Sequence, residues 1–166
     1  MKRSILFLLL VLLAAQFSCK IAFVLAQEQE EDSRLAAVEV IKTFYESAGK
    51  GDLDSALKLI SPNFSCFING ETMDYKRHEV FLKDSLELTH KRFIRFSLYN
   101  VRVNLEVSGD NAIAEVDLYW KGFDTIVFVD KSGYRKRMVN LAKENGVWQI
   151  TCIGPLEPPS AQQPQP

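Results

Sequence analysis

Hydrophobic positions recur every three to four residues in the first half of the chain and every second residue in much of the second half. Residues 35–48 carry apolar side chains on one stripe and glutamate and lysine on the other, which predicts an amphipathic helix. Gly49 and Gly51 follow directly, and glycine accepts the left-handed backbone that ends a helix. The first predicted element is therefore a helix that ends near residue 49.

Two further helices are predicted, each preceded by an aspartate that can accept hydrogen bonds from the free amides of the first turn. Asp52 precedes a short segment with one apolar face, residues 53–60. Asp74 precedes a longer segment, about 75–93, whose apolar stripe includes Leu82.

Strands are predicted where the period falls to two. Residues 99–107 and 112–120 alternate strictly between apolar and polar, which is typical of strands with one buried face. Earlier in the chain, Asn69-Gly70 predicts a hairpin turn between short strands at 64–68 and 71–73. The remaining expected strands are 125–129, 135–143 and 147–153, with turns at 109–111, 131–133 and 144–146. Helices followed by antiparallel strands predict an α+β fold, with a curved sheet wrapped around the helices.

The first 26 residues have the three parts of a signal peptide. Lys2 and Arg3 form a basic start, residues 5–15 are apolar without interruption, and Ala26 suits cleavage before a polar segment. We therefore expect an exported protein, periplasmic or secreted.

Two alternatives to a cleaved signal peptide are disfavoured by the sequence. A membrane anchor is disfavoured because Gln16, Ser18 and Lys20 interrupt a run that would need ~18–20 apolar residues. A lipid anchor through Cys19 is disfavoured because Gln16 stands where a bacterial lipobox has an aliphatic residue.

The 140 residues after the signal suit one domain. We expect an acidic leader at 27–32, the domain at 33–153 and a disordered Pro/Gln-rich tail at 154–166. Three of the basic residues and no acidic ones precede residue 27, which leaves 17 basic and 21 acidic residues, net −4. This charge excludes a nucleic-acid footprint and a polybasic membrane surface, so neither partner is expected for the mature chain.

Cleavage after Ala26 leaves two cysteines, Cys66 and Cys152, both among apolar neighbours. An exported compartment permits a disulfide, and two cysteines allow only one intramolecular pairing. A domain with a core of ~120 residues does not need that crosslink, so we expect two buried thiols, with the disulfide as the alternative. No CxxC motif or Cys/His cluster points to structural zinc.

Residues 38–60 and 139–150 together resemble a known family. The first segment has an aromatic-bearing helix, a Gly-Asp turn and a short helix with Ala and Leu on its inner face, and the second resembles a closing hairpin. Both are similar to the nuclear transport factor 2-like (SnoaL-like) domain, over roughly residues 33–153. The resemblance implies a cone-shaped fold whose sheet curls round the first and third helices and leaves a pocket between them. It implies little about activity, because isomerases, dehydratases, cyclases and transport factors share this fold.

Ketosteroid isomerase, an enzyme of this family, uses a carboxylate base and a hydroxyl donor in an apolar cavity. Aligned on the Gly-Asp turn, the donor position falls on Phe44, which has no hydroxyl, and Tyr45 points about 100° away round the helix. The base position falls near Ile68, followed by Asn69, and neither accepts a proton at neutral pH. We therefore expect no chemistry of this kind.

Dehydratase-like members of the family combine His, Asp and Tyr. The two histidines here, His78 and His90, lie 12 residues apart on one predicted helix and hence ~18 Å apart, so they cannot act together. His78 could be an acid or base at the pocket edge, but a solvated helix residue is the simpler interpretation. His90 is expected at the surface.

Asp117 and Tyr119 share one face of a predicted strand. If that face lined the cavity, Asp117 would be a partly buried carboxylate of raised pKa beside a hydroxyl donor. The alternation favours the opposite arrangement, with Asp117 outside and the apolar set inside: Ala114, Val116, Leu118 and Trp120.

No Ser/His/Asp set, P-loop, dinucleotide-binding glycine turn or HExxH motif occurs, so we expect no catalytic residue, cofactor or metal. The sequence predicts a non-catalytic domain that binds a small apolar ligand, with four candidate lining residues: Tyr45, Asp117, Tyr119 and Trp120. One alternative is a cofactor-free lyase or isomerase with Asp117 as base. The other is a protein-interaction module that forms a homodimer through the outer sheet face.

Overall fold

The computed structural model describes residues 27–155 except Asn69, and the chain divides into two units at Leu35 and Ala36. Residues 27–50 are helical, and this helix includes residues 27–32, the segment expected as an acidic leader. The predicted signal peptide and residues 156–166 of the predicted tail lie outside the described residues.

The first helix ends at a glycine in the left-handed region, as predicted. Gly51 has a φ of 78°, its amide donates to the carbonyl of Ala48 at 3.0 Å, and the Asp52 amide donates to Ser47 at 2.9 Å. The Asp52 carboxylate then accepts from the Ser55 amide at 3.1 Å and caps helix α2, Leu53–Leu57.

Helix α3, Tyr75–Arg92, begins with the predicted cap. The Asp74 carboxylate accepts from the Arg77 amide at 2.9 Å. Before it, strands β1 (Ser65–Ile68) and β2 (Glu71–Asp74) form the short antiparallel pair that Asn69-Gly70 predicted.

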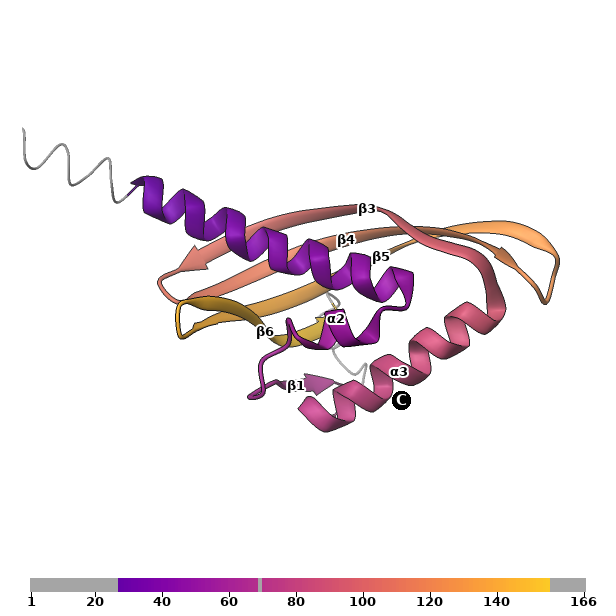
Figure 1. Cartoon of the computed structure of the whole chain (residues 1–166), viewed down its shortest axis with the longest axis horizontal. Helices are drawn as coiled ribbons and strands as arrows, with labels where there is room; N and C mark the ends of the chain where they lie inside the picture. Colours follow the sequence, from indigo (N-terminus) through magenta and orange to yellow (C-terminus); the bar gives the residue numbers. More distant parts are fainter. Residues whose placement is uncertain (1–26, 69, 156–166) are drawn as a thin grey trace, which may run out of the picture. The chain divides into compact units, whose positions relative to one another are not determined.

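The remaining strands form one antiparallel sheet in chain order, β3-β4-β5-β6 (Figure 1). Their bounds are β3 Phe93–Ser108, β4 Asn111–Asp124, β5 Val129–Glu144 and β6 Val147–Pro155. The predicted α+β order, helices followed by a curved antiparallel sheet, is confirmed.

One predicted strand and one predicted turn are wrong. Residues 125–128, expected as part of a strand, form the turn between β4 and β5, and the expected turn at 131–133 lies within β5. The run Thr-Ile-Val-Phe-Val has strong strand propensity, but the β4–β5 pairing continues without a shift to Asp124 and Val129. The ladder therefore determines where the chain reverses.

The core lies between the first helix and one face of the sheet. Ile41 and Phe44 of the helix are at most 2% exposed, as are Val116, Val139 and Ile150 of the sheet. Each large aliphatic side chain buried in this way contributes about 1.5–3 kcal/mol. We call this side of the sheet the inner face.

Strand β1 is tied to β6 by a disulfide between Cys66 and Cys152, whose Cα atoms are 4.9 Å apart. The expectation of two buried thiols is therefore wrong. Core size bears on whether a crosslink is needed, whereas the fold determines whether two thiols meet. Ile60 also pairs with Ile150 in a parallel bridge, which brings the segment before β1 against β6.

Candidate functional site

Of the four predicted ligand residues, Trp120 lies on the inner face of the sheet and Tyr45 lies in the core on the first helix, whereas Asp117 and Tyr119 lie on the opposite, outer face. Ala114, Val116 and Leu118 are buried against the helix, and Trp120 continues their alternation. Tyr45 lies in the same core. Asp117 and Tyr119 alternate with these residues and therefore face outward.

Tyr45 is a buried tyrosine with no hydrogen-bond partner among the described residues. It is 7% exposed, and its ring meets Phe44 edge-on with centroids 5.0 Å apart. Burial raises the pKa of its hydroxyl, against the opposing influence of the Arg137 charge. Arg137 pairs with Val116 across the ladder and so belongs to the inner face as well.

Trp120 packs in an aromatic cluster near the end of the inner face. Its ring lies 5.2 Å from Phe93 and 6.0 Å from Phe96, centroid to centroid. Its cross-strand partner is Gly133, where a Cβ atom would fall 2.5 Å from the indole ring. The glycine is needed because the indole covers the position of its missing side chain.

Asp117 belongs to a polar group on the outer face. Its carboxylate accepts a hydrogen bond from the Tyr134 hydroxyl at 2.7 Å and lies 3.9 Å from the Lys136 ammonium. The Tyr119 ring packs on Tyr134 at 5.0 Å and carries the Arg102 guanidinium 5.5 Å above it. This carboxylate is therefore engaged on the side of the sheet away from the core.

His78 is the polar side chain whose position differs most from expectation. It is 5% exposed rather than solvated, its ring stacks on Phe64 at 4.4 Å, and neither ring nitrogen has a partner among the described residues. Burial lowers its pKa to about 4, so the imidazole is neutral at pH 7. His90, by contrast, is exposed as expected, with its ring edge 6.0 Å from Phe96.

A pocket of about 320 Å³ lies where the β1–β2 pair meets α3. We call it the α3 pocket. Phe81, in its wall, has its ring 6.5 Å from His78. The residues lining the α3 pocket are Ile68, Glu71, Thr72, Met73, Arg77 and Phe81.

The structure places the two isomerase positions in different surroundings. Phe44 is 2% exposed within the core and offers no hydroxyl, and Ile68 lies in the wall of the α3 pocket. Ile68, which aligns with the catalytic base of the isomerase, therefore contributes an apolar side chain to the α3 pocket.

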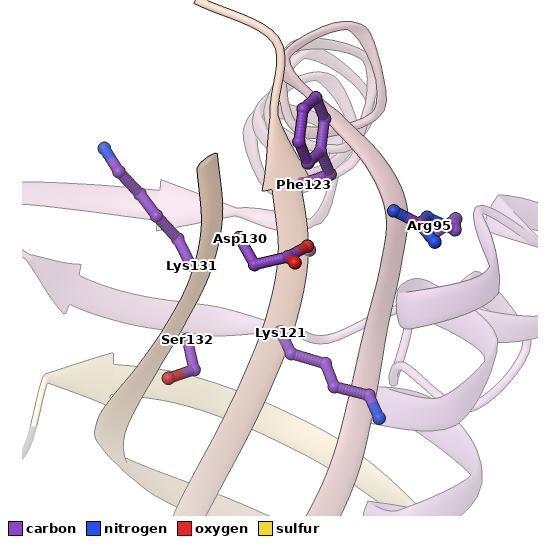
Figure 2. A pocket seen from close by; sticks show the side chains of 7 residues that line it. Arg95, Lys121, Phe123, Asp130, Lys131 and Ser132 are labelled. Carbon is purple, nitrogen blue, oxygen red and sulfur yellow. The ribbon is translucent and has the colours of Figure 1, made fainter. Parts of the chain in front are cut away.

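A second pocket, of about 460 Å³, lies near the turn between β4 and β5 (Figure 2). Arg95 and Lys121 extend to one side of it and Lys131 to the other (Figure 2). The residues lining this hairpin pocket are Arg95, Lys121, Gly122, Phe123, Asp130, Lys131 and Ser132. Neither pocket is lined by any of the four residues predicted from sequence.

In the described part of the chain, no three His, Cys, Asp or Glu side chains come together in a way that could hold a metal ion. None of the described helices is both long and apolar enough to cross a membrane.

The burial of His78 had a signal in the sequence that the prediction missed. His78, Leu82 and Leu86 are spaced four residues apart and so continue one stripe of α3 toward its start. Asp124 gave a similar signal, because it continues the even-numbered, inward-facing positions of β4, and it is fully buried.

The sequence matches no protein-family model and no curated protein. Solved structures, by contrast, share the fold at low sequence identity. A nuclear transport factor 2-like protein with a cystatin-like fold from Novosphingobium aromaticivorans is 14% identical, with a TM-score of 0.64, over 83% of this chain and 91% of that one. A hexachlorocyclohexane dehydrochlorinase from Novosphingobium barchaimii is 14% identical, with a TM-score of 0.64, over 77% and 88%.

A third similar structure is a nuclear transport factor 2-like superfamily protein from Salmonella enterica, 18% identical, with a TM-score of 0.57, over 81% of this chain and 95% of that one. The chain therefore has the nuclear transport factor 2-like fold, as the resemblance of its two sequence segments implied. Identities this low establish the fold alone, and function must be argued from the site.

Proposed function

We propose that this protein binds a small, largely apolar molecule carrying one hydrogen-bonding group, and does not transform it. The observation that carries the proposal is His78, which is buried and has no hydrogen-bond partner among the described residues. His78 does not itself line the α3 pocket, but its ring lies 6.5 Å from that of Phe81, which does. A buried polar group without a partner costs about 1–3 kcal/mol, and a ligand that supplies the partner recovers that cost.

The α3 pocket favours an apolar ligand over an anion. Ile68, Met73 and Phe81 supply apolar walls, and 320 Å³ suits a small molecule. The one cation, Arg77, is already engaged by the Glu71 carboxylate at 2.5 Å and the Thr72 carbonyl at 2.9 Å. An anionic ligand would have to displace both.

Three features support binding without catalysis. A histidine with a pKa of about 4 is a weak base at neutral pH, whereas efficient general bases have pKa values near the working pH. Phe44 stands where an oxyanion donor would be needed, and Asp117 lies on the outer face. The alternative of a lyase or isomerase with Asp117 as base would therefore need its substrate on the side of the sheet away from the pocket.

Naphthol and naphthalene form a matched pair of probes, because they differ by one hydroxyl. In titrations followed by native mass spectrometry, we expect the wild-type protein to bind naphthol with about tenfold higher affinity than naphthalene. This difference corresponds to about one net hydrogen bond. His78→Phe keeps the ring and removes both nitrogens, so it should abolish the preference. Tyr119→Phe removes a hydroxyl from the outer face and is the control that should leave the preference intact.

Three results would contradict the proposal. The binding site would be wrong if neither probe bound, or if His78→Phe kept the preference for naphthol. The non-catalytic assignment would be wrong if product signals grew in NMR spectra of a bound compound in proportion to the protein added.

A further inference from the structure

The turn between β4 and β5 presents four consecutive apolar side chains to solvent (the orange end of the sheet in Figure 1). Ile126, Val127, Phe128 and Val129 are 67%, 50%, 75% and 47% exposed. We call these four residues the apolar tip. Single exposed apolar residues are ordinary, but a contiguous group at the end of a hairpin indicates an interaction site.

The backbone of the apolar tip is fixed by hydrogen bonds at its base. The buried Asp124 carboxylate accepts from the Ile126 amide at 2.9 Å and pairs with Arg92 at 3.0 Å and Lys131 at 2.9 Å. The amide and hydroxyl of Thr125 both donate to the Arg92 carbonyl at 2.9 Å. The tip is thus ordered before a partner arrives, which lowers the entropy cost of binding.

The backbone at Phe128 is unfavourable for a residue with a side chain. Its φ of 55° lies in the left-handed region, where glycine is favoured. Such strain is kept where the surrounding structure enforces it, and it is commonest at functional positions. Glycine would adopt this turn geometry at lower cost. The presence of a phenylalanine therefore suggests that its ring has a role other than forming the turn.

Positive charge surrounds the base of the apolar tip. Arg92, Arg95, Lys121 and Lys131 lie there with two acids, buried Asp124 and exposed Asp130, for a net charge of +2. Residues 27–166 as a whole have a net charge of −4, so this end is basic on an acidic chain. Lys121 lies three residues before Asp124, which places its backbone ~10 Å back along the strand.

We propose that the apolar tip inserts into the surface of an anionic phospholipid bilayer, with the surrounding cations at the level of the headgroups. Apolar side chains at a membrane interface enter to a depth of ~5–10 Å, which is comparable to the distance from the base of the tip at Asp124 back to Lys121. Lysine and arginine add affinity for the negative surface potential. This proposal replaces the expectation, drawn from net charge alone, that the mature chain has no membrane partner.

A second copy of the chain fits this surface less well. Four side chains fall far short of the ~1,200 Å² that a stable protein–protein interface buries. Two tips meeting symmetrically would also bring their cations together, which is unfavourable. Bilayer insertion needs neither a large area nor a partner of complementary shape.

Co-sedimentation with vesicles tests the proposal directly. We expect the wild-type protein to bind vesicles of phosphatidylcholine mixed with phosphatidylglycerol, to bind pure phosphatidylcholine weakly, and to lose affinity as salt rises. Ile126→Ser with Phe128→Gly should weaken binding at least ~tenfold while folding stability is kept, because glycine suits the backbone. Arg95→Gln with Lys121→Gln should weaken binding roughly twenty- to thirtyfold, since each cation contributes about a factor of five.

Phe67→Ser is the matched control, because Phe67 is 73% exposed on β1 and is as accessible as Phe128. It should bind vesicles as the wild type does. The proposal is overturned if the wild type does not bind anionic vesicles. It is equally overturned if Phe67→Ser weakens binding as much as the tip variant, Ile126→Ser with Phe128→Gly. It is also overturned if the tip variant binds normally but loses a dimer in sedimentation, since the partner is then a second copy. The apolar tip and the α3 pocket share no residue, so this outcome is independent of the ligand proposal.

Discussion

Two polar side chains, His78 and Asp124, are buried in the same fold but differ in their hydrogen bonding. The Asp124 carboxylate is fully engaged, and its hydrogen bonds with Lys131 and Arg92 hold its pKa well below the usual range. His78 has no partner among the described residues, and burial lowers its pKa. The first is the pattern of a structural anchor, whereas the second leaves two buried ring nitrogens without a compensating hydrogen bond among the described residues.

His78 makes the stability of the fold depend on pH. Its pKa is about 4 in the folded protein and about 6.5 when unfolded, so the unfolded chain binds the extra proton between these values. The free energy of unfolding should therefore fall as the pH drops from about 6.5 toward 4, by up to ~3 kcal/mol. Urea titrations at several pH values measure this loss.

Comparison of variants isolates the contribution of His78 from those of other titrating groups. His78→Phe should be less sensitive to acid than the wild type, whereas His90→Phe, which alters an exposed histidine on the same helix, should keep the wild-type dependence. Identical pH profiles for the wild type and His78→Phe would show that the histidine is solvated in solution.

Gly133 should resist substitution despite its partial exposure. A Cβ atom there would lie 2.5 Å from the indole of Trp120, which Phe93 and Phe96 hold in place. We expect Gly133→Ala to cost about 1–3 kcal/mol of stability, measured by chemical denaturation. Gly154→Ala is the matched control, because its Cβ would meet nothing closer than the Cys66 sulfur at 4.0 Å. Equal stability of the two variants would contradict the packing described.

At the scale of elements, local signals predicted what local physics determines. The Asp52 and Asp74 caps and the glycine after the first helix each act within a few residues, and all three were predicted. The chain reversal at 125–128 was missed because Gly133, which suggested a turn, serves instead to admit a side chain from β4. Periodicity within one segment carries no information about its cross-strand neighbour.

The disulfide joins elements that are distant in the chain. Cys66 and Cys152 are separated by 86 positions, so the bond restricts a long loop in the unfolded chain. We expect the Cys66→Ser, Cys152→Ser double variant to lose about 2–5 kcal/mol in urea unfolding. Addition of reductant should lower the stability of the wild type and leave the double variant unchanged. A wild type insensitive to reductant would favour the buried thiols expected from sequence.

For the whole molecule, the sequence was sufficient for the architecture and insufficient for the site. The two segments that resemble the nuclear transport factor 2-like domain lie at its opening helices and closing hairpin, and the strands between them follow by alternation. The predicted site residues depended on which face of the sheet holds a cavity. Tyr45 lies in the core and Trp120 on the inner face, but the α3 pocket lies elsewhere, between the β1–β2 pair and α3. Cleavage after Ala26 remains a prediction.

The bond between Cys66 and Cys152 also has a consequence for proteolysis. The exposed turn at 125–128 lies between these two cysteines in the chain. A protease that nicks the turn once would leave two fragments that still migrate as one species on a gel without reductant. The fragments would separate only when the sulfur–sulfur bond is broken, so damage at this exposed end would not by itself release half of the protein.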